Sequence, residues 1–527
     1  MPTLSWIGKD KVTNHHQDVP YRVLEHKYTY IDGGAAGNEQ LDGNKIIKGD
    51  NLAALKSLLP RYEGKIKCVY IDPPYNTGNE GWVYNDNVND PKIKKWLGEV
   101  VGKEGEDLSR HDKWLCMMYP RLKLLQKLLS DDGAIFISID DNEQANLKLI
   151  CDEVFGINSF VTDLIWRSAD SSNNDSKQFS GDYNHTLVYS KTRGWQPLRF
   201  ARREENNQHY KNPDNDPRGQ WFQSNLQSPN YRANLQYDVI SPDGTVIKAP
   251  KNGWRWSQEK MSAWIADGTV IFPGNQARII KKTFLKDQLG IVPSNIWWDV
   301  EDTGHNRNAK YELLKVFPKF HSSEVFKTPK PTKFINKILQ LFPPENLIVL
   351  DSFAGSGTTA HAVLNLNKQD RGNRKFILVE MEDYAETITA ERVRRVIDGY
   401  GDVKGTGGSF SFYELGEPLL LESGCLNENI PVECIREYVF YMETRKTLPK
   451  LADKSESPYY IGENADTDYY FYYERDRITT LDRAFLGTLN RQAEGRVVYA
   501  DKCQISPEDL EKFRVVFKKI PRDIARL

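Results

Sequence analysis

The feature that most constrains the fold is an alternation of strand-like and helical segments that occurs in two separate halves of the chain. In the first half, KIIKGD (45–50), KIKCVYID (65–72) and AIFISID (134–140) alternate with segments that have leucines at helical spacing. In the second half, LIVLD (347–351) and KFILVEME (375–382) alternate with further helical segments. Apolar strands that alternate with helices are typical of a parallel sheet covered on both faces. The sequence therefore predicts one α/β sheet built from two distant parts of the chain.

The stretch between the two halves has a different character. It is rich in Asn, Pro, Gly, Trp and Tyr and has no sustained helical period. It is too long for a loop within a compact domain, which indicates an inserted domain. A chain of 527 residues is also too long for a single core. We expect an N-terminal extension (1–44), the first half of the sheet domain (45–166), the insert (167–325), the second half (326–400) and a C-terminal α+β domain (401–527).

The net charge of −2 is unevenly distributed along the chain. Residues 161–330 hold 24 Lys and Arg against 18 Asp and Glu, together with eight of the twelve tryptophans. Residues 401–527 hold 18 Lys and Arg against 22 Asp and Glu. A mildly basic, aromatic-rich middle region suits a nucleic-acid surface. An ordinary aromatic-rich domain with a charge fluctuation explains these counts equally well.

The cysteines and the apolar segments indicate a cytoplasmic protein. The six cysteines (68, 116, 151, 425, 434 and 503) show no CxxC or CxxH spacing, so we expect neither a disulfide framework nor a zinc site. No apolar stretch is long enough to span a bilayer, and the first residues lack the apolar core of a signal peptide. We expect no metal site.

LDSFAGSGTTAHAVL (350–364) predicts a strand, a glycine turn and the start of a helix. Gly355 and Gly357 allow backbone torsions and a close ligand approach that a Cβ atom would forbid. Glu380 ends the next predicted strand, at the distance typical of an acid that bonds the ribose hydroxyls of an adenosine-containing cofactor. No Lys-Ser or Lys-Thr follows the glycines, which argues against a nucleotide-triphosphate loop.

Two aspartates at strand ends have alternative interpretations. Asp351 either fixes the glycine turn alone or also reaches the amine of the cofactor. Asp50 ends the strand expected beside the cofactor's adenine, where it either accepts a hydrogen bond from the adenine amino group or caps the helix from Asn51.

DPPY (72–75) and FAGSGTT (353–359) resemble motifs of the amino-methyltransferases of DNA, which use S-adenosylmethionine and share a Rossmann-like sheet. DPPY comes first and a long insert follows, an order similar to that of the permuted beta group, in which the insert is the target-recognition domain. Over residues 45–165 and 290–400 the chain most resembles the Mod (modification) subunits of type III restriction-modification systems. The segments that carry this likeness are GDNLAAL, IDPPYNTGNEGWVYNDN, HDKWLCMMYPRLKLL, DDGAIFISIDDNE, IWWDVEDTGHN, KTPKPTKFI and DSFAGSGTTAHAV.

The resemblance implies a circularly permuted Rossmann-like methyltransferase sheet and assigns further residues to the cofactor. Lys327 and Thr328 in KTPKPTKF resemble the motif that closes over the methionine moiety; a polar turn before a helix is the alternative. Residues of the two strand ends and of the glycine motif complete the expected cofactor site: Asp50, Asp351, Phe353, Ala354, Gly355, Ser356, Gly357, Thr358 and Glu380.

The turn 72–75 suits methyl transfer to an exocyclic amine. The lone pair of such an amine is delocalised into the ring and has to be turned toward the methyl group. Asp72 and the Pro73 carbonyl are predicted to accept the two N–H bonds, while Pro73 and Pro74 hold these acceptors rigidly. Tyr75 offers a face on which an extruded base can stack. An aspartate at the first position of the motif implies adenine, by family resemblance alone.

The expected function is N6 methylation of adenine in double-stranded DNA, with a restriction (Res) subunit and a second copy of the chain as possible partners. Cytosine-N4 methylation and a mainly DNA-recognising subunit for a nuclease are the alternatives. Methyltransferases with a PPY motif that act on protein glutamine or RNA fit less well, because they carry Asn in place of Asp72 and lack the long insert. Trp82 and Tyr84 are candidates for further base stacking, and Arg199, Arg202 and Arg203 for contacts with phosphates or guanine edges.

Overall fold

The computed structural model describes residues 3–36, 38–40, 43–77, 108–274, 278–321, 326–449, 457–521 and 524. Its contacts divide the chain into two compact units. One comprises Met1–Pro197 with Ser294–Leu527, and the other comprises Leu198–Pro293. In the described residues no helix combines the length and the apolar character needed to cross a bilayer.

The first half of the sheet domain follows the predicted alternation closely. Asp50 precedes a helix with four buried leucines, and the strand after it is buried along almost its whole length. The elements here are β3 (Lys45–Lys48), α3 (Asn51–Tyr62), β4 (Ile66–Ile71), α5 (Leu108–Leu128), β5 (Leu129–Ile139), α6 (Gln144–Phe155), β6 (Phe160–Arg167) and β7 (Tyr183–Ser190). Helix α5 ends at Leu128, because the chain is already paired with β4 from Leu129.

The second half supplies the remaining central strands and helices. The glycine turn lies between a short buried strand and a helix whose first turns are fully buried. The elements are β13 (Ile296–Trp297), α9 (Val300–Thr303), α10 (Asn306–Val316), α11 (Thr332–Leu339), β14 (Ile348–Asp351), α12 (Thr358–Asp370), β15 (Lys375–Glu380), a π-helical segment (Ala385–Ala390) and α13 (Glu391–Asp398).

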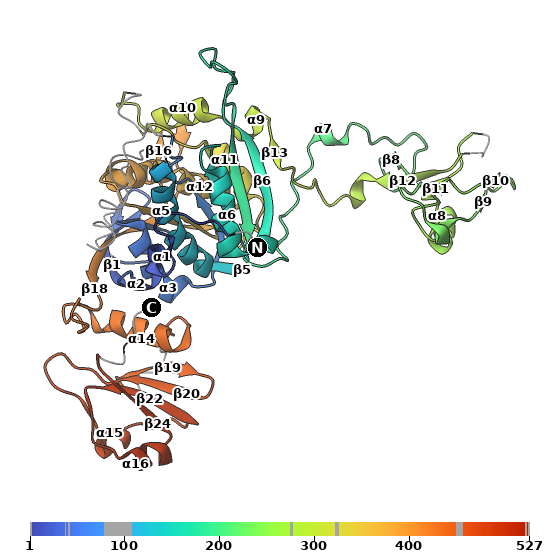
Figure 1. The fold of residues 1–527 in the computed structure, drawn as a ribbon. Coiled ribbons are helices and arrows are strands. Elements are labelled where there is room, and N and C mark those ends of the chain that lie inside the picture. The colour runs from blue at the N-terminus through green and yellow to red at the C-terminus, as the bar shows by residue number, and fades with distance from the viewer. Residues whose placement is uncertain are drawn as a thin grey trace. The chain divides into compact units, whose positions relative to one another are not determined.

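All of these strands join one sheet of eleven, with the order β13-β6-β7-β5-β4-β14-β15-β3-β18-β1-β2 (Figure 1). From β5 to β18 neighbouring strands are parallel, as predicted. Toward both ends antiparallel pairs appear, since β7 runs against β5 and β6, and β1 runs against β18 and β2. The outermost strand β13 pairs parallel with β6. The N-terminal extension, expected to be irregular, therefore contributes strands β1 (Arg22–Ile31) and β2 (Gly34–Ala36), after the short helices α1 (Lys9–Val12) and α2 (His15–Asp18).

The two faces of the parallel strands are covered by different helices. Val69, Ile71 and Ile135 belong to the main core cluster together with buried residues of α3, α5 and α6. On the opposite face, Tyr70 packs edge-on against Phe334 of α11. Because successive side chains of a strand alternate between its faces, the predicted cover on both faces is confirmed.

The inserted unit is narrower than the expected range 167–325, because β6, β7 and the segment after Pro293 belong to the large sheet unit. It holds a three-stranded sheet in the order β11-β12-β8, a hairpin of β9 and β10 and its own small core around Trp254 and Met261. Its elements are α7 (Glu204–Asn207), β8 (Trp221–Ser224), β9 (Val239–Ile240), β10 (Val246–Ile247), α8 (Gln258–Ala266), β11 (Val270–Ile271) and β12 (Ile280–Phe284).

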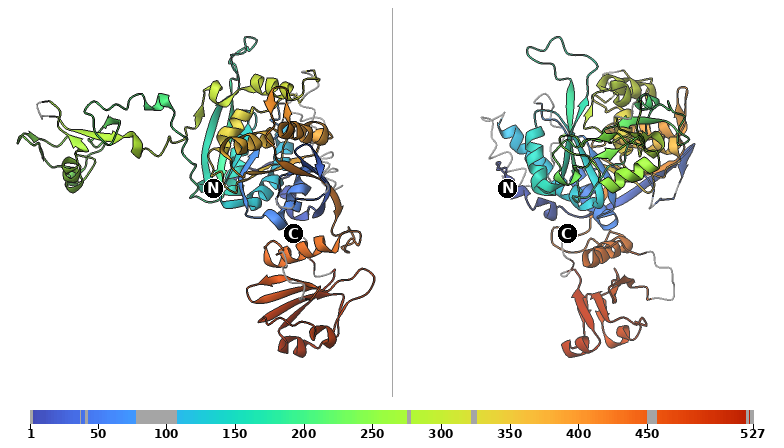
Figure 2. Two further views of the ribbon diagram at one scale, coloured as in Figure 1. Left: turned by 180° about the vertical axis from the view of Figure 1, so that it is seen from behind. Right: turned by 90° about the vertical axis from the view of Figure 1, so that its right-hand side faces the viewer.

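The segment 399–408, at the expected boundary with the C-terminal domain, forms the hairpin β16 (Gly399–Tyr400) and β17 (Val403–Lys404) and leads into β18 (Ser409–Pro418) of the large sheet. After β18 come α14 (Val432–Thr444) and a four-stranded sheet in the order β19-β20-β22-β24, which forms the red part of the ribbon in Figure 2. The remaining elements are β19 (Tyr460–Asn464), β20 (Thr467–Phe471), β21 (Thr480–Leu481), α15 (Arg483–Leu486), β22 (Gly495–Ala500), β23 (Lys502–Cys503), α16 (Pro507–Lys512) and β24 (Val515–Lys519).

Candidate active site

Four predicted site carboxylates lie at the carboxyl-terminal edge of adjacent parallel strands. Asp72 directly follows β4 and Asp351 ends β14, while Glu380 ends β15 and pairs in register with Lys48 of β3, two residues before Asp50. Carboxyl ends of parallel strands are where α/β sheets bind their ligands. The register therefore brings together residues that are as much as 330 positions apart in the sequence.

The glycine turn after β14 is held against β15 by Glu380. The Gly355 amide donates to Glu380 Oε2 at 2.7 Å, and the Glu382 amide donates to Oε1 at 3.1 Å. Gly355 and Gly357 both have positive φ, at 51° and 78°, as the sequence predicts for this turn. A Cβ atom on Gly355 would approach the Phe326 ring to 2.8 Å. Burial raises the pKa of Glu380 to about 7.

Asp351 fixes the same turn from the other side. Its Oδ1 accepts from the Phe353 amide at 3.1 Å, and its Oδ2 accepts from the Thr359 hydroxyl at 2.6 Å. Burial raises the pKa of Asp351 to about 7. These hydrogen bonds agree with the interpretation in which Asp351 fixes the glycine turn.

The other residues of the glycine motif are buried and held by Arg392. Its guanidinium donates to the Ser356 hydroxyl at 3.0 Å and to the Thr358 hydroxyl at 2.7 Å. Phe353 and Ala354 are also buried. The motif is thus a buried turn whose polar side chains are bound inward by Arg392.

Asp50 caps α3, since its Oδ1 accepts from the Ala53 amide at 2.8 Å. Its other oxygen lies 3.6 Å from the buried guanidinium of Arg121. Arg121 also donates to the side chain of Asn51, whose amide donates to the Ser352 carbonyl at 3.3 Å. The cap is one of the two interpretations that the sequence leaves open, and it does not exclude the other.

The turn 72–75 is organised around a lysine that the sequence did not single out. Lys330 Nζ lies 2.6 Å from each carboxylate oxygen of Asp72 and 2.8 Å from the Tyr75 hydroxyl. The Trp114 indole donates to the Pro74 carbonyl at 2.7 Å. In the described part of the chain no group donates to the Pro73 carbonyl. The turn thus presents one carboxylate, one free carbonyl and one aromatic ring.

A second buried carboxylate supports the end of this turn. Glu143 is fully buried and accepts from Asn76, from Asn146 at 2.8 Å, and shares a 2.6 Å contact with His111 Nδ1. Asn76 has a positive φ of 61°, which a non-glycine residue adopts only where its surroundings hold it. Neither Glu143 nor Asn76 was predicted from the sequence.

Lys327 and Thr328 are exposed, whereas Lys330 in the same KTPKP segment is buried. The sequence feature that sets Lys330 apart is its place in KTPKP, where it is the second lysine and directly precedes Pro331. Trp82 and Tyr84 lie outside the described residues. Among the described residues, no group of three or more His, Cys, Asp or Glu side chains is placed to hold a metal ion.

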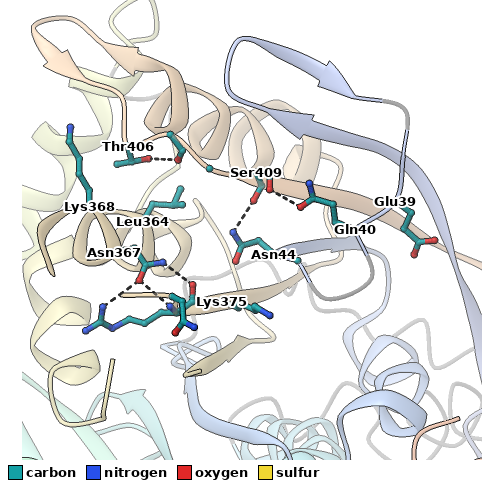
Figure 3. Close-up of a pocket in the computed structure, with 14 residues that line it drawn as sticks. Glu39, Gln40, Asn44, Leu364, Asn367, Lys368, Lys375, Thr406 and Ser409 are labelled. Atoms are coloured by element: carbon teal, nitrogen blue, oxygen red, sulfur yellow. Dashed lines mark hydrogen bonds between the residues drawn. The ribbon is translucent and has the colours of Figure 1, made fainter. Parts of the chain in front are cut away.

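A cavity of about 740 Å³ lies at the opposite edge of the sheet (Figure 3). Lys375 begins β15, and Asn44 and Ser409 lie at the starts of β3 and β18. Asn367 of α12 accepts from the Arg374 amide, and Asn44 donates to the Ser409 carbonyl. This cavity is therefore at the amino ends of the strands, away from the carboxylates described above.

A family model described as DNA methylase matches residues 66–391, which include both DPPY and the glycine motif. The chain belongs to this family. Its sequence is 37% identical to the Mod subunit of the type III restriction-modification enzyme StyLTI from Salmonella typhimurium, over 72% of this chain and 58% of that subunit. It is 30% identical to the EcoP15I Mod subunit from Escherichia coli, over 72% of this chain and 64% of that subunit.

A third relative is the type II methyltransferase M.KpnI from Klebsiella pneumoniae, at 29% identity over 68% of this chain and 89% of that protein. The matched region of the chain spans about 60% of the length of the two Mod subunits. These comparisons confirm the resemblance to Mod subunits and the Rossmann-like methyltransferase fold expected from the sequence.

Proposed function

We propose that the chain transfers a methyl group from S-adenosylmethionine to the N6 amino group of adenine in double-stranded DNA, as a modification subunit of a type III restriction-modification system. The observation that carries the proposal is the juxtaposition of the Asp72–Tyr75 turn and the Gly355–Gly357 turn on neighbouring strand ends. Membership of the DNA methylase family and the identity to two Mod subunits support it.

The glycine turn and its acid fit an adenosine-containing cofactor. Two positive-φ glycines leave the backbone open to a ligand, and buried Glu380 is placed at the strand end where such an acid binds ribose hydroxyls. Asp50, Asp351, Lys327 and Thr328 complete the proposed cofactor site, with Phe353, Ala354, Ser356 and Thr358 of the turn. S-Adenosylmethionine supplies the methyl group on a positively charged sulfur.

The catalytic turn supplies two acceptors for the target amine. Asp72 accepts one N–H bond and the Pro73 carbonyl accepts the other, so that the nitrogen lone pair is directed out of the ring plane. Pro73 and Pro74 lack amide donors and fix the backbone. The described contacts leave the Pro73 carbonyl free for this role, whereas the Pro74 carbonyl is bound by Trp114. Catalysis then rests on orientation and charge placement, without a covalent intermediate.

The target base has to leave the double helix to reach this turn. The Tyr75 ring is partly buried against the core, and the Lys330 ammonium lies 5.0 Å from its centroid. A ring fixed in this way offers a stacking face for an extruded base. Adenine is favoured over cytosine because Asp72 opens the motif and because the two Mod relatives are named as type III enzymes.

The inserted unit is proposed to recognise the DNA sequence. It carries Arg199, Arg202 and Arg203 and a small independent core. Association with a restriction (Res) subunit, and a homodimer, belong to the same proposal. A chain that only recognises DNA for a nuclease would not need an intact catalytic turn and an intact cofactor turn.

The test is nucleoside mass spectrometry of mixed-sequence DNA incubated with the protein and labelled S-adenosylmethionine. Label in N6-methyladenine is the expected result. Label in N4-methylcytosine would keep the mechanism and overturn the choice of base. Absence of label from DNA, with cofactor binding shown separately by calorimetry, would contradict the proposed activity of the chain alone.

A further inference from the structure

Lys330 is a buried cation whose side-chain contacts within the described part of the chain belong to the catalytic turn. It is 8% exposed, and its ammonium bonds both oxygens of Asp72 and the hydroxyl of Tyr75. The same ammonium lies over the Tyr75 ring. A lysine is rarely buried to this extent unless a partner offsets the loss of hydration. Here the partner is the residue proposed to bind the target amine.

The backbone that carries Lys330 is itself fixed. Pro331 is the N-cap of α11, and the next residue, Thr332, is bound by Glu312 through both its amide, at 3.1 Å, and its hydroxyl. A Cβ atom on Gly304 would approach Pro331 Cβ to 2.8 Å, so the segment is closely packed. The packing around Pro331 and Thr332 therefore fixes the backbone from which the Lys330 side chain reaches Asp72.

Among the residues that the structure describes, the other ionisable groups that face Asp72 are acids or phenols. Asp351 faces it from β14, Tyr70 from β4 and Tyr75 from the turn, and Asp140 acts on Tyr75 from the end of β5. Burial raises the pKa of both tyrosines, so they remain neutral. Among these facing groups Lys330 is the cation. Without it, a carboxylate at this position would be opposed only by other carboxylates and neutral rings.

We propose that Lys330 is a positioning residue for methyl transfer, which fixes the plane of the Asp72 carboxylate while its free lone pairs face the target amine. The inference rests on the proposed function and deepens it. An ionised carboxylate has about four acceptor sites, so binding Lys330 through both oxygens leaves sites for the amine. Tyr75 is fixed by the same ammonium, which ties the stacking face to the acceptor.

The experiment compares Lys330→Met with the wild-type chain for transfer of labelled methyl groups to mixed-sequence DNA. We expect transfer to fall by about 100-fold, the loss typical of a misplaced catalytic group. The affinity for S-adenosylmethionine, measured by calorimetry, is expected to stay within about threefold because Lys330 contacts the turn and not the glycine loop.

Lys330→Cys, alkylated with 2-bromoethylamine, restores an amine at nearly the original length and is expected to recover at least about tenfold in transfer. Wild-type protein treated in the same way controls for alkylation of the six native cysteines. Lys333→Met is the matched control, because Lys333 is exposed and bonds the Glu301 carbonyl.

Two results would overturn the inference while the proposed function stands. One is a Lys330→Met protein as active as the wild type. The other is a loss of transfer that the restored amine does not reverse, which would assign Lys330 a purely structural role. A wild-type chain that methylates no DNA would overturn the proposed function itself.

Discussion

At the scale of single residues, Asp72 separates binding of the base from binding of the cofactor. Asp72→Ala should reduce methyl transfer by at least about 1,000-fold, because the amine loses its charged acceptor. Cofactor affinity should be nearly unchanged, since the glycine turn is held by Asp351 and Glu380. Calorimetry with S-adenosylmethionine checks this directly, and a variant that no longer binds the cofactor would refute the assignment of Asp72 to the base.

In the proposed cofactor site, the raised pKa of Glu380 is expected to make cofactor binding dependent on pH. Its pKa is raised to about 7 by burial, so the carboxyl takes up a proton as the pH falls below that value. Ribose hydroxyls donate to the ionised form, and binding should therefore release a proton. We expect affinity to be about tenfold weaker at pH 6 than at pH 8. Titrations in two buffers of different ionisation enthalpy measure this release; Glu380→Gln should weaken binding and flatten its pH dependence.

The raised pKa of Glu380 has the opposite consequence for the stability of the protein without cofactor. Between the ordinary glutamic acid pKa and about 7, the folded chain holds a proton that the unfolded chain has lost. Stability should therefore fall as the pH rises through this window and should change no further above it. Asp351, with a pKa of about 7, acts in the same direction.

At the scale of elements, the turn between β14 and α12 requires glycine for two separable reasons. Gly355→Ala places a Cβ atom at positive φ and brings it to 2.8 Å from Phe326. Gly401→Ala is a matched control, since φ is 53° there but the space is open. In both variants the positive φ of the new alanine should lower the free energy of unfolding by about 1 kcal/mol. Crowding against Phe326 should lower the free energy of unfolding of Gly355→Ala alone by roughly a further 1–3 kcal/mol. The same variant should also bind the cofactor more weakly.

Urea unfolding measures the loss of stability in each variant, and calorimetry measures the loss of cofactor affinity. Comparing the two variants separates the cost of positive φ from the cost of crowding. Equal stability and equal affinity in the two variants would show that the contact with Phe326 has no energetic effect. The prediction concerns the local strand-turn-helix unit alone, so it holds whichever base is methylated.

The elements of the parallel centre could be predicted from the sequence, because buried strands and amphipathic helices have clear periods. Gly355, Gly357 and Glu380 were predictable for the same reason, since their spacing follows the strand-turn-helix unit. Lys330, Glu143 and Asn76 were not, because their partners lie on other elements and nothing in the local pattern indicates burial. A lysine in a polar turn and a glutamate at a helix start are ordinary surface residues until the fold brings them against Asp72 or Asn76.

At the scale of the whole molecule, strands outside the two predicted halves extend the sheet. β1 and β18, from the N-terminal extension and from the expected C-terminal domain, pair with each other beside β3. Alternating aromatic residues in SFSFYELGEP (409–418) were the available signal. The antiparallel edges were missed because the pattern of one strand does not reveal the direction of its neighbour.

The segment after β18 is joined to α3 by a buried ion pair. Arg61 donates to both oxygens of Glu437 on α14, at 2.5 and 2.9 Å, and the Glu437 side chain is 11% exposed. Glu437→Gln should lower the free energy of unfolding by about 2 kcal/mol, because a bidentate, largely buried pair is broken. The exposed Glu433 on the same helix provides the control variant Glu433→Gln, with a change within about 0.5 kcal/mol. Similar denaturant midpoints for the two variants would contradict this.

The inserted unit is closed at its base by an antiparallel bridge. Phe200 and Ile291, 91 residues apart, exchange backbone hydrogen bonds of 2.9 and 2.8 Å, so the chain enters and leaves the unit at neighbouring points. Recombination between related genes at these two positions would therefore exchange the whole unit and leave every strand of the large sheet in place. With DNA recognition by the inserted unit as proposed, a lineage that carries this fold would acquire a new sequence preference in one genetic event, while its methyl-transfer chemistry would pass unchanged to its descendants.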